Sequence, residues 1–256
     1  MEQTQNSTVA PQASAPKIKL TPVLTLLESA ISVWWKNLAK FVGIYLWGLL
    51  YALIPLAIAG LLFGLESWLD NRLNLASSIA INTIIFLAVL LAAYFSIRAY
   101  AGIFLLVKKN YEGNEHDIFK EAKDYFWPYL GLAFLTAVFI LLWTLLLIIP
   151  GIIYSIFYSF AVYAFFFEGK RGMAAIKRSV QLVKGYWWAI FGRFLLLGIV
   201  LWIFLMIISL PLAATTPGTP FYTIWNALVQ VISFIIGPIS LLFYYQIYQD
   251  LVKIKK

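Results

Sequence analysis

Long apolar segments alternate with short polar ones along almost the whole chain. Six of them are long enough to cross a hydrocarbon core of about 30 Å as helices that rise about 1.5 Å per residue. They cover residues 41–63, 77–106, 128–149, 151–167, 189–211 and 223–248. Only Pro150 and Gly151, a pair typical of tight turns, separate the third segment from the fourth. The pattern predicts an all-α polytopic membrane protein with six transmembrane helices.

A short segment of mixed polarity precedes the first, third and fifth apolar segments and ends in two adjacent aromatic residues. The pairs are Trp34–Trp35, Phe126–Trp127 and Trp187–Trp188, and a proline follows each pair near the far end of the next apolar segment, at Pro55, Pro150 and Pro211. Apolar residues seven and four positions before each pair share one helical face. This recurrence predicts three interfacial amphipathic helices and a threefold parallel repeat with units at about 24–109, 115–170 and 173–251. Interfacial aromatics in any helical bundle would give a similar alignment, so that interpretation stays open.

In the third mixed segment, apolar and basic residues fall on different sides of the predicted helix. Ile176, Val180 and Val183 form one face, and Lys177, Arg178, Gln181 and Lys184 lie off it. A helix of this kind lies in the headgroup plane, with its lysines near anionic lipid. An indole ring is apolar and its N–H is polar, so we expect interfacial anchors at the tryptophans of the three pairs. These are Trp34, Trp35, Trp127, Trp187 and Trp188.

Composition and charge support membrane insertion and predict an orientation. Hydrophobic residues make up 62% of the chain and charged residues 12%, against about 45–50% and about 25% in soluble domains. Residues 1–20 are predicted to be a disordered cytosolic tail, and residues 21–256 a single six-span membrane domain. With the N-terminus inside, the outer loops carry only Arg72 of the 19 lysines and arginines, which predicts that both termini are cytosolic.

Several kinds of chemistry find little support in the sequence. The chain has no cysteine and a single histidine, His116, which excludes disulfides, thiolate sites and clusters of histidine ligands. No aspartate, glutamate or lysine lies in the middle of a predicted span, and this disfavours ion-coupled transport. No catalytic motif is present either. The sequence therefore predicts no catalytic residue, no cofactor, no metal and no enzyme activity.

Two groups of polar residues in the apolar segments remain as candidates. Arg98 and Arg193 either extend to the interface or form a lipid headgroup or anion site with Glu168. Nucleic-acid binding would require a solvent-facing basic patch with exposed aromatics, whereas here the aromatics lead into apolar segments. The predicted partners are thus membrane lipids, in particular anionic inner-leaflet headgroups, and no nucleic acid.

The second group of polar residues is a stripe on the sixth apolar segment. Its members are Asn226, Gln230 and Ser233, and they precede Gly237–Pro238, a pair expected to kink or unwind the helix. Such a stripe either contacts a neighbouring helix or lines a permeation path.

Residues 149–194 carry a family resemblance. Pro150–Gly151 follows an apolar run, Glu168 precedes a basic loop, Ala175–Ser179 reads A-x-K-R-S, and Gly185 precedes Trp187–Trp188. This segment resembles the membrane domain attached to some bacterial glycerophosphoryl diester phosphodiesterases, and stand-alone bacterial membrane proteins of unassigned function. The resemblance implies a multi-helix membrane domain without diesterase activity, since catalysis in those enzymes belongs to a separate soluble barrel.

Three functions follow as hypotheses. The first is a non-enzymatic protein of the bacterial cytoplasmic (inner) membrane that binds lipid or organises a membrane complex. The second is a transporter or channel for a small or lipidic solute. The third, implied by the resemblance alone, is an accessory membrane domain for a soluble phosphodiesterase partner.

Overall fold

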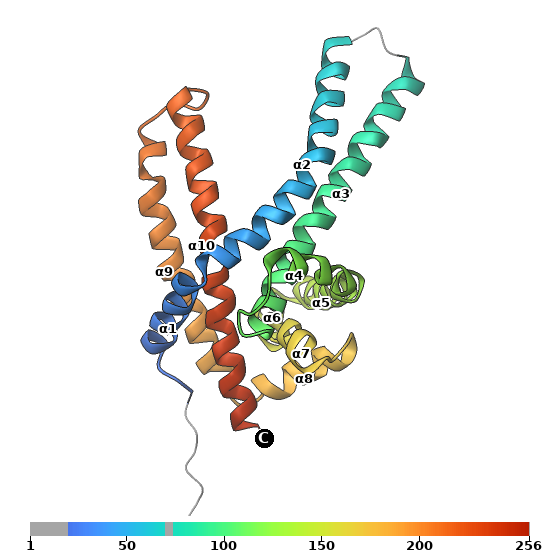
Figure 1. Ribbon diagram of the computed structural model, residues 1–256. Coiled ribbons are helices and arrows are strands. Elements are labelled where there is room, and N and C mark those ends of the chain that lie inside the picture. Colours follow the sequence, from blue (N-terminus) through green and yellow to red (C-terminus); the bar gives the residue numbers. More distant parts are fainter. Residues whose placement is uncertain (1–19, 70–73, 256) are drawn as a thin grey trace, which may run out of the picture.

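The computed structural model describes residues 20–69 and 74–255, and every regular element in these ranges is a helix (Figure 1). Six helical segments within them are long and apolar enough to cross a membrane: Leu38–Leu69, Leu75–Lys108, Glu115–Leu146, Ile148–Glu168, Trp187–Ala213 and Pro220–Ile254. The predicted all-α fold with six spans is confirmed. The predicted tail, up to residue 19, and the loop residues 70–73 with Arg72 lie outside the described residues.

The first three helices are α1 (Val23–Lys36), α2 (Leu38–Leu69) and α3 (Leu75–Lys108). The helices α2 and α3 run antiparallel side by side (Figure 1). Gly48 permits their close approach, because a Cβ atom at this position would lie 2.6 Å from the Cβ of Ala99. The side chain of Asn74 caps α3 by accepting a hydrogen bond from the Ser77 N–H at 2.9 Å.

The middle of the chain forms α4 (Glu115–Glu121), the 3₁₀ helix η2 (Ala122–Tyr125), α5 (Phe126–Leu146), α6 (Ile148–Tyr158) and α7 (Ala161–Glu168). The turn predicted at Pro150–Gly151 is wrong: the chain turns at Leu147, whose backbone is extended. Pro150 is the third residue of α6, where a helical N–H has no intrahelical acceptor, so proline is tolerated. Gly151 then lets α5 approach, since a Cβ atom there would lie 3.0 Å from the Cα of Thr144.

The last three helices are α8 (Met173–Val183), α9 (Trp187–Ala213) and α10 (Pro220–Ile254). Helix α10 continues without interruption through Pro238, so this proline does not unwind it. One turn earlier, the carbonyl of Ile235 accepts a hydrogen bond of 3.0 Å from the indole of Trp34 in α1. A side-chain donor from another helix therefore bonds to the backbone close to the proline.

Figure 1 shows the α2–α3 hairpin and the α9–α10 hairpin diverging from a common base, with α5 viewed nearly along its axis. The buried core lies at that base and combines parts of α3, α4, α7, α8 and α10. Its largest aromatic members include Phe104 and Phe166, whose rings stack with centroids 4.6 Å apart. The far halves of the hairpins expose large apolar side chains such as Phe63, Trp68 and Ile207, as helices that face lipid do.

The two members of each aromatic pair lie in different environments. The first member packs into the protein, and this holds for Trp34, Phe126 and Trp187. The second member is exposed: the exposed fraction is 69% for Trp35, 75% for Trp127 and 77% for Trp188. In the predicted order, a short helix precedes each antiparallel pair: α1 precedes α2 and α3, α4 precedes α5 and α6, and α8 precedes α9 and α10. The threefold repeat and the interfacial position of these helices stay predictions.

Candidate functional site

The fourth span is interrupted between α6 and α7, and a serine of α8 bonds to the backbone at the break. The Ser179 hydroxyl donates to the carbonyl of Phe157 at 2.7 Å and accepts from the N–H of Phe160 at 3.0 Å. Ser179 and Phe160 are both fully buried. Backbone polar groups away from water require such partners. The short helix α8 therefore stabilises the interruption of the fourth span through the side chain of Ser179.

A second set of polar contacts joins the end of α7 to α8 and α10. Both carboxylate oxygens of Glu168 lie 2.9 Å from the Nε of Arg178, and Oε1 also accepts a hydrogen bond of 2.8 Å from the Tyr248 hydroxyl. Gly169 ends α7 with a left-handed backbone (φ 69°), which glycine adopts without strain. The A-x-K-R-S stretch thus supplies a buried Ala175, the ion pair of Arg178 and the hydroxyl of Ser179.

Arg98 joins α3 to α4. Its Nε donates to the carbonyl of Phe119 at 2.8 Å, and its Nη2 donates to the carbonyl of Lys120 at 3.2 Å. The guanidinium carbon also lies 4.3 Å from the centroid of the Phe119 ring, a distance typical of a cation–π contact. The contacts of Arg98 are therefore with backbone carbonyls and an aromatic ring, and Glu168 is not among them.

Arg193 holds the beginning of α1. Its Nη2 donates to the carbonyl of Thr21 at 2.9 Å and to that of Leu20 at 3.3 Å, while Nη1 bonds within α9 to Ala189. The N–H of Thr21 donates to Asp250 of α10 at 3.0 Å. The N-terminus of α1 is thus fixed to α9 and α10.

The three residues of the predicted headgroup site consequently have separate partners. No hydrogen bond or ion pair within the described ranges joins Arg98, Glu168 and Arg193. The partner of Glu168 is Arg178, which the sequence placed among the surface cations of a lipid-facing helix. Backbone carbonyls of distant segments bind the two arginines, and periodicity contains no information about such contacts.

Among the hydrogen bonds of the described residues, none joins Asn226, Gln230 and Ser233 of the predicted polar stripe on α10 to one another. The Ser233 hydroxyl donates to the carbonyl of Val229 in its own helix at 2.7 Å. Asn226 is half-buried and Gln230 is exposed. A hydroxyl bonded within its own helix is common where no other partner is near.

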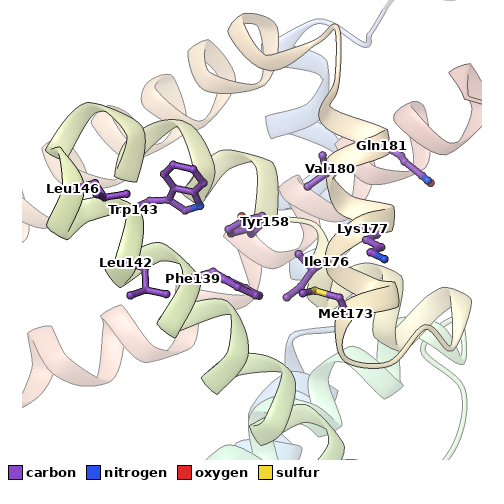
Figure 2. A pocket seen from close by; sticks show the side chains of 10 residues that line it. All are labelled: Phe139, Leu142, Trp143, Leu146, Tyr158, Met173, Ile176, Lys177, Val180 and Gln181. Carbon is purple, nitrogen blue, oxygen red and sulfur yellow. The ribbon is translucent and has the colours of Figure 1, made fainter.

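An apolar groove of about 680 Å³ lies between α5 and α8 (Figure 2). We name it the α5–α8 groove. One wall comes from α5, the other from α8, and Tyr158 of α6 lies between them. Figure 2 shows Ile176 and Val180 directed towards the groove, and Lys177 and Gln181 at its outer edge. The complete lining is Phe139, Leu142, Trp143, Leu146, Tyr158, Met173, Ile176, Lys177, Val180 and Gln181.

Sequence reasoning found one wall of this groove and missed the other. The apolar face of α8 follows from helical spacing, whereas the approach of Leu142 and Trp143 depends on how α5 packs beside α8 in three dimensions. Within the described part of the chain, no cluster of three or more histidine, aspartate or glutamate residues could hold a metal ion.

Comparison with protein-family models, with curated proteins and with solved structures found no match to this chain. The resemblance of residues 149–194 to a phosphodiesterase membrane domain stays a prediction. The six apolar helices make the chain a multi-pass integral membrane protein, and its function has to be argued from its own contacts and cavities.

Proposed function

We propose that this protein is a non-enzymatic membrane protein that binds an anionic phospholipid in the α5–α8 groove. An acyl chain would lie between the apolar walls, and the lipid phosphate would lie near the ammonium group of Lys177. The observation that carries the proposal is an apolar groove with a single cation at its edge. Its volume of about 680 Å³ is in the range of about 300–1,000 Å³ that small-molecule sites occupy.

Lys177 is the cation best placed to receive a phosphate. The neighbouring Arg178 is already paired with Glu168, so its charge is balanced inside the protein. Lys177 is exposed and lines the groove, whereas Lys184, the residue directly after the end of α8, is exposed and does not line it. A basic residue near an anionic membrane surface contributes about 1 kcal/mol to binding.

The same proposal places α8 at the inner leaflet of a bacterial cytoplasmic membrane, with both termini cytosolic. The exposed tryptophans of the aromatic pairs support this placement, because an exposed indole at the end of a span is typical of the membrane interface. The charge distribution adds further support, since basic residues concentrate in the segments that would face the cytosol.

Native mass spectrometry of the detergent-purified protein tests the function. Wild type is incubated with equimolar phosphatidylglycerol and phosphatidylcholine, and retained lipid is compared with that of Lys177→Glu. We expect this charge reversal to lower the phosphatidylglycerol fraction at least fivefold, about 1 kcal/mol. Lys184→Glu is the matched control, because it makes the same charge change at the C-terminal end of α8, outside the groove.

A second variant tests the apolar part of the groove. Val180→Trp adds bulk to one wall and leaves every charge in place, so we expect it to lower retention of both lipids. Equal phosphatidylglycerol retention in wild type, Lys177→Glu and Val180→Trp would rule out the α5–α8 groove as a lipid site.

A further inference from the structure

A separate pocket of about 330 Å³ lies where five segments meet: the end of α3, the end of α4, the helix η2, the beginning of α5, and α7 with its connection to α8. It shares no lining residue with the α5–α8 groove. Unlike that groove, it is lined by charges of both signs together with aromatic rings. The residues that matter are Lys108, Glu121, Asp124, Tyr125, Phe165 and Arg171.

The charges of this pocket are only partly balanced within the protein. Glu121 forms an ion pair with Lys109 on the neighbouring turn. Among the described residues, Asp124, Lys108 and Arg171 take part in no ion pair. The ammonium of Lys108 lies 5.8 Å from the centroid of the Tyr125 ring. Two cations and one carboxylate therefore border the same small space without an ion-pair partner among the described residues.

This combination selects a particular chemistry. A guanidinium binds phosphate oxygens through parallel N–H donors, and a lysine ammonium adds a point charge. The carboxylate of Asp124 would repel a ligand that is only anionic, but it attracts a primary ammonium. We propose that the pocket binds a phosphoethanolamine group, with the phosphate between Lys108 and Arg171 and the ammonium at Asp124.

Such a group can belong to a phospholipid or to a small soluble molecule. Trp127 lies next to the lining residue Pro128 and is 75% exposed, so the pocket lies beside a predicted interfacial anchor. A lipid headgroup and free phosphoethanolamine would make the same contacts with the three charged residues. The two sources differ only in the acyl chains, and binding measurements can separate them.

Titration calorimetry on the 256-residue chain in detergent provides the test, with four probes: short-chain phosphatidylethanolamine, short-chain phosphatidylglycerol, O-phosphoethanolamine and inorganic phosphate. The titrations use the Lys177→Glu variant as background, because it weakens phosphatidylglycerol binding in the α5–α8 groove, and we expect this protein to bind phosphatidylethanolamine about tenfold more tightly than phosphatidylglycerol. Asp124→Asn should remove this preference, and Arg171→Gln should weaken the binding of both lipids. Lys123→Gln is the control, because Lys123 is exposed on the same 3₁₀ helix and does not line the pocket.

The outcomes separate clearly. Tight binding of O-phosphoethanolamine supports a soluble source, and binding of the lipid alone supports a headgroup site. Equal affinity of the Lys177→Glu protein for the two lipids would overturn the assignment without a further variant. A preference that persists in Asp124→Asn would overturn it as well. Lys177 does not line this pocket, so the Lys177→Glu background leaves it intact and the two lipid sites can fail independently.

Discussion

The hydroxyl of Ser179 accepts a hydrogen bond of 3.0 Å from the backbone N–H of Phe160, 19 residues earlier in the chain. The same hydroxyl donates to the carbonyl of Phe157. Where a helix is interrupted in a membrane, backbone N–H and C=O groups lose their helical partners and water cannot replace them. Each group without a hydrogen bond then costs several kcal/mol of free energy. Here a single side chain of α8 satisfies a donor and an acceptor on the two sides of the interruption.

Ser179→Ala is therefore expected to destabilise the protein. The N–H of Phe160 would be left buried without a partner, which costs about 1–3 kcal/mol. The measurement is the apparent melting temperature in detergent. Ser209→Ala is a matched control, since the Ser209 hydroxyl bonds only to the carbonyl of Met206 in its own helix. Equal melting temperatures for the two variants would show that Ser179 does not hold the break.

The Glu168–Arg178 pair is expected to be energetically coupled. Its side chains are more buried than those of the Lys109–Glu121 pair, and Tyr248 adds a further hydrogen bond. A double-mutant cycle with Glu168→Gln and Arg178→Gln should give a coupling energy of about 1–3 kcal/mol. The same cycle on Lys109 and Glu121 should give about 0–1 kcal/mol. A larger coupling at the exposed pair would contradict this ranking.

Two glycines of α2 should respond in opposite directions to alanine. At Gly48 the new Cβ atom would lie 2.6 Å from the Cβ of Ala99, so α2 and α3 would have to separate. At Gly60 a Cβ atom would meet nothing within 4 Å. Gly48→Ala should lower the melting temperature, whereas Gly60→Ala should raise it, since alanine is favoured over glycine in a helix by about 1 kcal/mol. A stabilised Gly48→Ala would mean that the two helices are farther apart than the structure shows.

Span number and approximate limits could be read from the sequence, because a run of apolar residues must be long enough to cross a bilayer. The turn after the third span was misplaced by three residues. A proline can follow the end of one helix or occupy the first turn of the next, and Pro150 lies in the first turn of α6. The same residue type therefore occurs both after a helix and at the start of one, and local sequence does not distinguish the two positions.

The candidate sites were less predictable than the spans. The partners of Arg98 and Arg193 are backbone carbonyls, which every residue possesses, so no side-chain pattern marks them. Arg178 has the spacing of a surface cation on α8, and only the fold brings it to Glu168. The pocket lined by Lys108, Asp124 and Arg171 joins five segments, and its lining residues are widely separated in sequence. Helical periodicity describes one element at a time and cannot predict tertiary contacts between residues of different helices.

The two tryptophans of the third aromatic pair should contribute differently to stability and to lipid contact. The indole N–H of Trp187 donates to the carbonyl of Ile153 in α6 at 3.1 Å, and phenylalanine cannot replace that donor. Trp187→Phe should therefore lower the free energy of unfolding by about 1 kcal/mol, whereas Trp188→Phe should change it little.

Fluorescence quenching by brominated lipid provides the complementary measurement, because Trp188 is 77% exposed. Trp188→Phe should remove more of the quenchable emission than Trp187→Phe. The first pair gives a parallel comparison, since the indole of Trp34 bonds to Ile235 and Trp35 is exposed. If both pairs show an inner member that stabilises and an outer member that contacts lipid, the predicted repeat gains support. Equal quenching losses within a pair would place both of its indoles in the same environment and argue against interfacial anchoring by the outer one.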